Sequence, residues 1–188
     1  GGTNSATNLA MAKVAAEKKK PFIAIGAGTS RLTNEECTPY TVHYAYDTAA
    51  MARGTAAALT KQGNKDWFFL TADYVFGMSL EKDASDVVKA TGGKVLGSVR
   101  HPLAASDFSS FLLQAQNSKA QVLGLANAGG DFINSVKQAA EFGVRRERRR
   151  GQVHIRGGNT PFFAACLQPS TADTTVSMTC RARYGASP

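Results

Sequence analysis

Four short segments of the sequence combine backbone that can approach a ligand closely with hydroxyl, amide or aromatic side chains. They are Asn4–Ser5, Gly26–Ser30, Asp73–Gly77 and Asn127–Asp131. The first supplies a hydroxyl and the free N–H groups of a predicted helix start, a combination that suits an anion. The second adds two hydroxyls, the third two aromatic rings, and the fourth an amide beside a Gly-Gly pair. Together these groups suit a small ligand with a carboxylate and an apolar or aromatic body.

The sequence lacks the patterns of a catalytic or metal centre. His43, His101 and His154 have no neighbouring nucleophile in a recognisable elbow, and the patterns G-x-S-x-G, GxxxxGK[ST] and GxGxxG are absent. The three cysteines, at positions 37, 166 and 180, show neither CxxC spacing nor a matching histidine cluster. We therefore predict a binding protein and not an enzyme, with no cofactor and no metal. A structural interpretation of the same residues stays open, because glycine pairs form tight turns and aromatic rings usually pack in cores.

Helical and strand-like segments alternate between residues 8 and 143. We predict a helix over Asn8–Lys20 and another capped by Asp47 or Thr48, with Met51, Thr55, Ala58 and Leu59 on one stripe. Gly63 suits the position just after that helix. A further helix is predicted to be capped by Ser106 or Asp107. The strand-like runs are Phe22–Ile25, Tyr40–Tyr46, Trp67–Leu70, Lys94–Val99 and Gln121–Ala126.

The last three of these strands recur about every 27 residues with one amphipathic helix between them, which is the βαβ rhythm of a parallel sheet. The predicted fold class is therefore α/β, with parallel-sheet βαβ layers. We expect Trp67–Leu70, Val95–Val99 and Val122–Leu125 to be buried in this sheet.

The basic charge of the chain is concentrated after residue 144. The formal net charge is +8, but residues 1–144 hold 14 basic and 12 acidic side chains, whereas residues 145–188 hold eight arginines and two acids. The high overall isoelectric point therefore does not indicate a nucleic-acid partner. The helix and strand pattern also stops here, at the charge run Arg145–Arg150. We interpret residues 145–188 as a divergent tail that is disordered or frame-shifted.

The run Trp67–Gly77 resembles the opening of the C-terminal lobe in type I periplasmic binding proteins, specifically the branched-chain amino-acid group of ABC-transporter substrate-binding proteins. Supporting segments are Gly26–Thr33, His43–Asp47, His101–Gln114 and Leu125–Asp131. The resemblance covers residues 1–144. It implies part of a two-lobed periplasmic binding protein type I fold that clamps its ligand, with residues 1–46 in the first lobe and residues 47–144 in the second.

The resemblance also implies ligand-binding positions. Ser5, Ala27 and Thr29 match first-lobe positions that hold a ligand's carboxylate and amino group. Phe76 stands where the family has the tyrosine of a Tyr-Gly pair, so the hydroxyl of that tyrosine is missing here. Asn127 falls near a second-lobe aromatic contact. The full set of candidate ligand-binding residues is Ser5, Ala27, Thr29, Tyr74, Phe76 and Asn127.

The function implied is a solute-binding receptor of an ABC transporter, periplasmic in its full-length parent. Its partners would be an amino acid or small organic acid and an ABC permease in the membrane. The chain opens without a signal peptide. Alternatives are a ligand-sensing domain of a signalling protein, an α/β enzyme with a nucleotide substrate, and a truncated, non-functional product that does not bind its ligand tightly.

Overall fold

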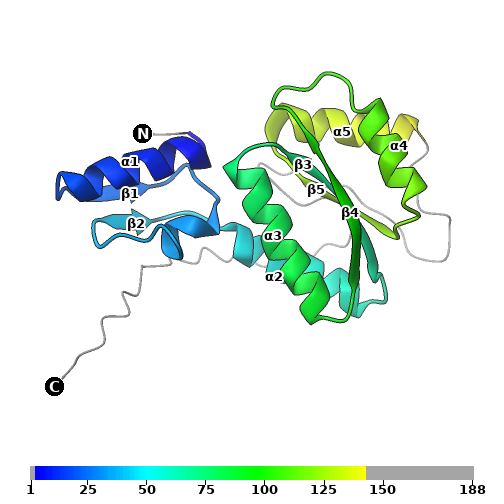
Figure 1. Ribbon diagram of the computed structural model, residues 1–188, viewed down its shortest axis with the longest axis horizontal. Helices are drawn as coiled ribbons and strands as arrows, with labels where there is room; N and C mark the ends of the chain where they lie inside the picture. The colour runs from blue at the N-terminus through cyan, green and yellow to red at the C-terminus, as the bar shows by residue number, and fades with distance from the viewer. Residues whose placement is uncertain (1–2, 143–188) are drawn as a thin grey trace.

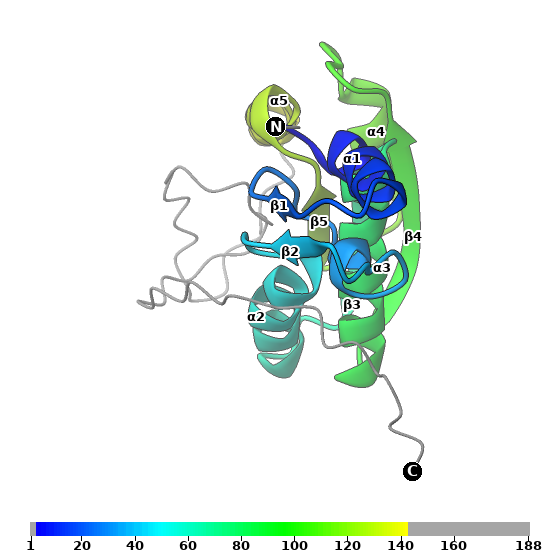
Figure 2. The ribbon, with the colours of Figure 1, turned by 90° about the vertical axis from the view of Figure 1, so that its left-hand side faces the viewer.

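The computed structural model describes residues 3–142, so the predicted tail at 145–188 lies outside the described residues. Figure 1 shows α1 (Ser5–Glu17), β1 (Phe22–Ala24) and β2 (Thr41–His43) at one end of the molecule and the other strands and α-helices packed together at the other. Figure 2 views the molecule from the first end. In chain order the elements are α1 (Ser5–Glu17), β1 (Phe22–Ala24), a 3-10 turn (Ser30–Thr33), β2 (Thr41–His43), α2 (Thr48–Lys61), β3 (Asp66–Ala72), α3 (Val75–Ala90), β4 (Lys94–His101), α4 (Ser109–Asn117), β5 (Val122–Ala126) and α5 (Gly129–Glu141).

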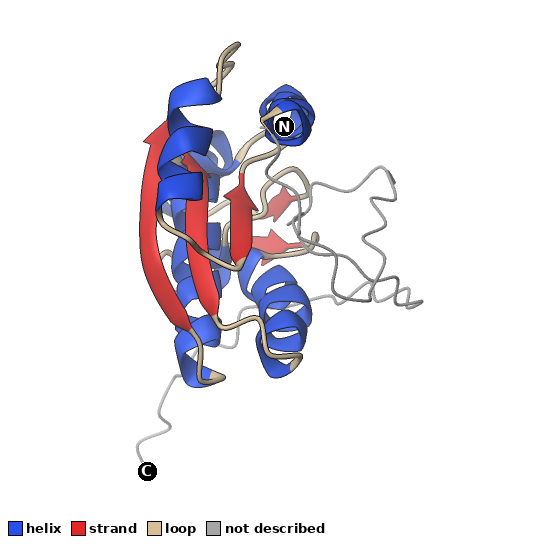
Figure 3. Cartoon of the chain, turned by 90° about the vertical axis from the view of Figure 1, so that its right-hand side faces the viewer, coloured by secondary structure: helices blue, strands red, loops and turns tan. Residues whose placement is uncertain are grey.

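The strands form two parallel sheets. β1 pairs with β2, and the larger sheet has the order β4-β3-β5, in which Leu70 lies opposite both Val99 and Leu125. The arrowheads of the three longer strands point to the same end of this sheet in Figure 3. Each crossover between these strands contains one helix, so the predicted α/β fold with βαβ units is confirmed.

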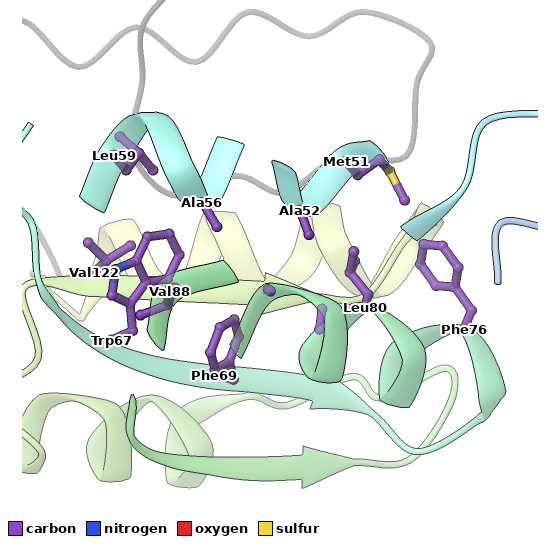
Figure 4. Packing of buried hydrophobic residues seen from close by; sticks show 12 residues of the cluster. Met51, Ala52, Ala56, Leu59, Trp67, Phe69, Phe76, Leu80, Val88 and Val122 are labelled. Atoms are coloured by element: carbon purple, nitrogen blue, oxygen red, sulfur yellow. The ribbon is translucent and has the colours of Figure 1, made fainter. Parts of the chain in front are cut away.

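The core surrounds β3, because this strand is covered on both faces. Trp67, Phe69 and Leu70 are fully buried. Trp67 and Phe69 face α2 and α3, whereas Leu70 packs with Phe108 and other residues of the layer formed by α4 and α5. Figure 4 shows the first of these clusters, with Met51, Ala52, Ala56 and Leu59 of α2 above the two rings. The burial predicted for the Trp67–Leu70 run is confirmed.

The burial predicted for Val95–Val99 is wrong. Side chains of β4 alternate between exposed and half-buried, and Leu96 is 46% exposed. Edge position alone does not explain this, because β4 and β5 both pair only with β3 among the described strands, yet Val122 and Leu125 of β5 are each 2% exposed. The run Val95–Val99 contains Gly97 and Ser98, and such a mixed run predicts a strand but does not show whether both of its faces are buried.

The predicted helix starts and stripes are correct only to within a few residues. α1 begins at Ser5 rather than Asn8, because the Asn4 side chain caps it by accepting from the Thr7 N–H at 3.0 Å. The N-cap of α4 is Phe108, one residue after the later of its two predicted caps, and the Asp107 Oδ1 accepts from the Ser109 N–H at 2.9 Å. On α2 the buried stripe runs through Met51, Ala52, Ala56 and Leu59, while the predicted Ala58 is exposed. The cap at Asp47 and the left-handed Gly63 after the helix are as predicted.

The cap of α2 gives a first testable prediction. The Asp47 carboxylate accepts from the Ala50 N–H at 2.6 Å and is only 4% exposed. We expect Asp47→Ala to lower the free energy of unfolding by about 1–2 kcal/mol, as lost caps do. Urea unfolding followed by circular dichroism measures this. Asp73→Ala is the control, because that carboxylate is 57% exposed and lies 3.7 Å from Arg100; we expect a change under about 0.5 kcal/mol. Equal losses in both variants would contradict a capping role.

Candidate functional site

A solvent-open hollow of about 210 Å³ lies where α1 and the loop after β1 meet the starts of α3 and α5. Both α3 and α5 follow strands of the larger sheet, so their N-termini stand at its carboxyl edge, where ligands of parallel α/β proteins bind. The hollow is lined by Thr3, Asn4, Ser5, Gly26, Gly28, Tyr46, Tyr74, Phe76 and Ala128.

One wall of the hollow is polar and belongs to the start of α1. Ser5 is the first residue of this 13-residue helix and is 2% exposed. Its Oγ accepts a hydrogen bond from the Thr29 N–H at 3.2 Å, so the hydroxyl hydrogen of Ser5 stays available to donate. The partial positive charge of a helix N-terminus adds to this donor. This wall can therefore bind an anionic group.

The opposite wall is aromatic. The rings of Tyr74 and Phe76 lie 6.0 Å apart between centroids. Gly28 makes room for the rings of Phe76 and Tyr46, because a Cβ at this position would lie 2.7 Å from the Phe76 ring and 3.2 Å from the Tyr46 ring. The glycine at 28 therefore serves close packing of the loop against two rings. This wall offers flat apolar surface to the body of a ligand.

Both phenols of the hollow are neutral at physiological pH, as tyrosines ordinarily are. Burial raises the pKa of Tyr46 further above that range. The pKa of Tyr74 is raised first by burial and further by the nearby Tyr46 and Asp131 groups. Each hydroxyl therefore remains an uncharged donor through the physiological pH range, and neither repels a bound carboxylate.

Of the six predicted ligand-binding residues, the structure places Ser5, Tyr74 and Phe76 in the wall of the hollow. The other three, Ala27, Thr29 and Asn127, are buried behind it, with exposures of 2% or less. The Thr29 Oγ1 lies 2.7 Å from the Ser79 Oγ, and the Asn127 Nδ2 lies 3.2 Å from the His101 Nε2.

Sequence analysis missed Tyr46 and Thr3 as lining residues, whereas Ala128 lies in the Asn127–Asp131 segment that it singled out. Tyr46 had a usable signal, because it is an aromatic residue at the end of a strand-like run, close to the carboxyl edge. Ala128 adjoins the predicted Asn127. Nothing in the sequence around Thr3 marks it.

Neither a metal-binding group nor a membrane-spanning helix is found in the part of the chain that the structure describes. No group of three histidine, cysteine or acidic side chains between residues 3 and 142 could hold a metal ion. Within the same range, every helix is too short or too polar to cross a bilayer.

Comparison with known proteins identifies the family. A sequence profile described as periplasmic binding protein matches residues 1–160. A crystal structure of a periplasmic binding protein from Burkholderia mallei is 70% identical, with a TM-score of 0.74, over 76% of this chain and 38% of that one. An ABC-transporter solute binding protein from Rhodopseudomonas palustris, crystallised with 3,4-dihydroxybenzoic acid, is 30% identical with a TM-score of 0.66, over 75% of this chain and 38% of that one.

Among curated proteins, a Leu/Ile/Val-binding protein homolog 6 from Brucella melitensis is 24% identical over 138 residues, or 73% of this chain. The chain spans 35% of the length of that relative. The match to the family profile nevertheless covers most of the sequence, and the parallel α/β fold agrees with it. The chain therefore belongs to the periplasmic binding protein family.

Proposed function

We propose that the protein is the solute receptor of an ABC transporter, which captures a small carboxylate in the periplasm of its parent cell and delivers it to a membrane permease. Residues 1–46 then contribute to the first lobe and residues 47–144 to the second. The observation that carries this proposal is the composition of the hollow. Its polar wall comes from the first of these parts, at Ser5, and its aromatic wall comes largely from the second, at Tyr74 and Phe76. A ligand in the hollow would contact both parts at once.

The lining favours an aromatic carboxylate over a zwitterionic amino acid. None of the nine residues that line the hollow carries a formal charge, so none of them supplies an anion to pair with an ammonium group. Asp131 lies near Tyr74, but its carboxylate is buried and accepts from the Ala104 N–H at 3.1 Å. The aromatic acid bound by the Rhodopseudomonas palustris relative supports the same ligand class. The carboxylate would lie at the start of α1 and the ring against Tyr74 and Phe76.

Substitution of Tyr74 tests this arrangement. We expect Tyr74→Ala to weaken binding of 3,4-dihydroxybenzoate by about tenfold, because a ring contact of roughly 1–1.5 kcal/mol is lost. We expect Tyr74→Phe to keep most of the affinity, since the ring remains. Titration followed by amide chemical shifts of the 188-residue chain reads out weak as well as tight binding.

Tyr44→Ala is the matched control, because this tyrosine is 57% exposed and lies outside the hollow. Amides of Ser5 and Gly28 should respond to the acid but not to its uncharged amide analogue. Equal responses to both compounds, or shifts confined to residues far from the hollow, would refute the proposed site.

A further inference from the structure

Two side-chain contacts join the loop after β1 to α3, the helix whose start carries the aromatic wall of the hollow. The Thr29 Oγ1 lies 2.7 Å from the Ser79 Oγ, and the Ser30 Oγ donates to the Asp83 Oδ2 at 2.8 Å. Ser79 and Asp83 are four residues apart on α3, so they lie on one face of the helix. Consecutive loop residues thus bind consecutive turns of α3.

Thr48, the first residue of α2, completes this network. Its hydroxyl donates to the same Asp83 Oδ2 at 2.6 Å and accepts from the Ser30 N–H at 3.0 Å. The Asp83 Oδ2 therefore accepts two hydroxyl hydrogen bonds, one from Ser30 in the first part of the chain and one from Thr48 in the second. Thr29 and Thr48 are fully buried, and Ser30 and Ser79 are no more than 7% exposed. Asp83 itself is half-buried, and hydrogen bonds to a charged carboxylate are stronger than those between neutral groups.

The network lies directly behind the hollow without lining it. The Thr29 N–H donates to the Ser5 Oγ at 3.2 Å, and the Gly28 carbonyl accepts from the Thr48 N–H at 2.7 Å. Ser5 and Gly28 both line the hollow, whereas Thr29, Ser30, Thr48, Ser79 and Asp83 do not. Ser5 and Gly28 are therefore each joined to the network by one hydrogen bond.

We propose that Thr29, Ser30, Thr48, Ser79 and Asp83 form a latch that holds residues 3–46 against residues 47–142 with the hollow assembled. Asp83 is its central positioning residue, because one of its oxygens binds the loop and α2 together. The bonds that Thr29 and Ser30 make to Ser79, Thr48 and Asp83 must break when the two parts separate, so the latch favours the arrangement in which one ligand contacts both. This inference rests on the proposed function only for the assignment of the hollow as the ligand site.

Hydrogen exchange in the 188-residue chain, without ligand, tests the latch. Loss of the carboxylate in Asp83→Ala should speed exchange of the Ser30 and Arg31 amides by about tenfold or more, the scale of one hydrogen bond to a charged group. Exchange in β3 should stay unchanged. Asp83→Asn retains an oxygen acceptor and should give a smaller increase. Asp86→Ala is the matched control, since this exposed carboxylate on the same helix pairs with Lys82, lies outside the latch and should change neither region.

Ligand titration of the same variants separates the latch from the proposed function. Asp83→Ala should weaken binding of 3,4-dihydroxybenzoate several-fold and speed loop exchange, whereas Tyr74→Ala should weaken binding without changing exchange at Ser30. An exchange increase below twofold in Asp83→Ala, or an equal increase in β3, overturns the latch. Faster loop exchange in a chain that shows no binding of the acid supports the latch and overturns the proposed function.

Discussion

Trp67→Ala should lower the free energy of unfolding by about 3–5 kcal/mol, the range for removing a fully buried tryptophan. The Trp67 ring is 0% exposed, lies 5.9 Å from the Phe69 ring, and packs in the cluster shared by α2, α3 and the sheet (Figure 4). Its Nε1–H also donates to the Asn64 carbonyl at 2.9 Å. The substitution would therefore leave a cavity and an unpaired carbonyl at the start of the central strand.

The loss is large compared with the roughly 5–15 kcal/mol that stabilises an ordinary domain. Urea unfolding followed by far-ultraviolet circular dichroism measures it without relying on tryptophan fluorescence. Leu96→Ala on β4 is the control, because this side chain is 46% exposed; we expect it to cost less than about 1 kcal/mol. Similar losses for the two variants would mean that β3 is not the centre of the core.

The parallel sheet could be predicted because its signal is local. An apolar run such as Trp67–Leu70, bounded by a polar turn and followed by an amphipathic helix, indicates a buried strand whatever its partners are. The position of each strand in the sheet, in contrast, has no local signal in the sequence. β3 lies between β4 and β5 although it precedes both in sequence, and this order depends on contacts between distant residues. The error at Val95–Val99 has another cause, because a mixed run does not show whether both faces of its strand are buried.

In the candidate site, too, some features have a local signal in the sequence and others depend on distant residues. The sequence indicated the loops that meet at the carboxyl edge, since each follows a strand. It could not indicate which side chain of a loop faces outward. Thr29 was predicted to contact the ligand, and the neighbour that the structure shows for its hydroxyl is that of Ser79, a residue 50 positions away. Likewise, nothing local explains Gly124, where a Cβ would lie 2.5 Å from the Phe69 ring of the neighbouring strand.

Gly77→Ala should disrupt both the fold and the site. Gly77 is a buried residue in the first turn of α3, where a Cβ would lie 2.1 Å from the Ala72 carbonyl oxygen and 2.9 Å from that of Ala126. Both atoms are backbone, so no side-chain rotation can relieve the overlap. The Ala72 carbonyl also accepts from the Tyr74 N–H at 2.8 Å, which fixes the turn that carries the aromatic wall. We expect a loss of about 3 kcal/mol or more in unfolding free energy, at the upper end for overpacking.

Gly54→Ala is the matched control, because it makes the same substitution in a helix where a Cβ would meet nothing within 4 Å. Alanine is the better helix former, so this variant should gain about 0.5–1 kcal/mol. The two variants should therefore shift the urea midpoint in opposite directions. The Gly77→Ala chain should also lose the response of Ser5 and Gly28 amides to 3,4-dihydroxybenzoate, because movement of the α3 start displaces Tyr74 and Phe76 together. A Gly77→Ala chain as stable as the parent would show that α3 does not approach the ends of β3 and β5 this closely, and the hollow would then lose its aromatic wall.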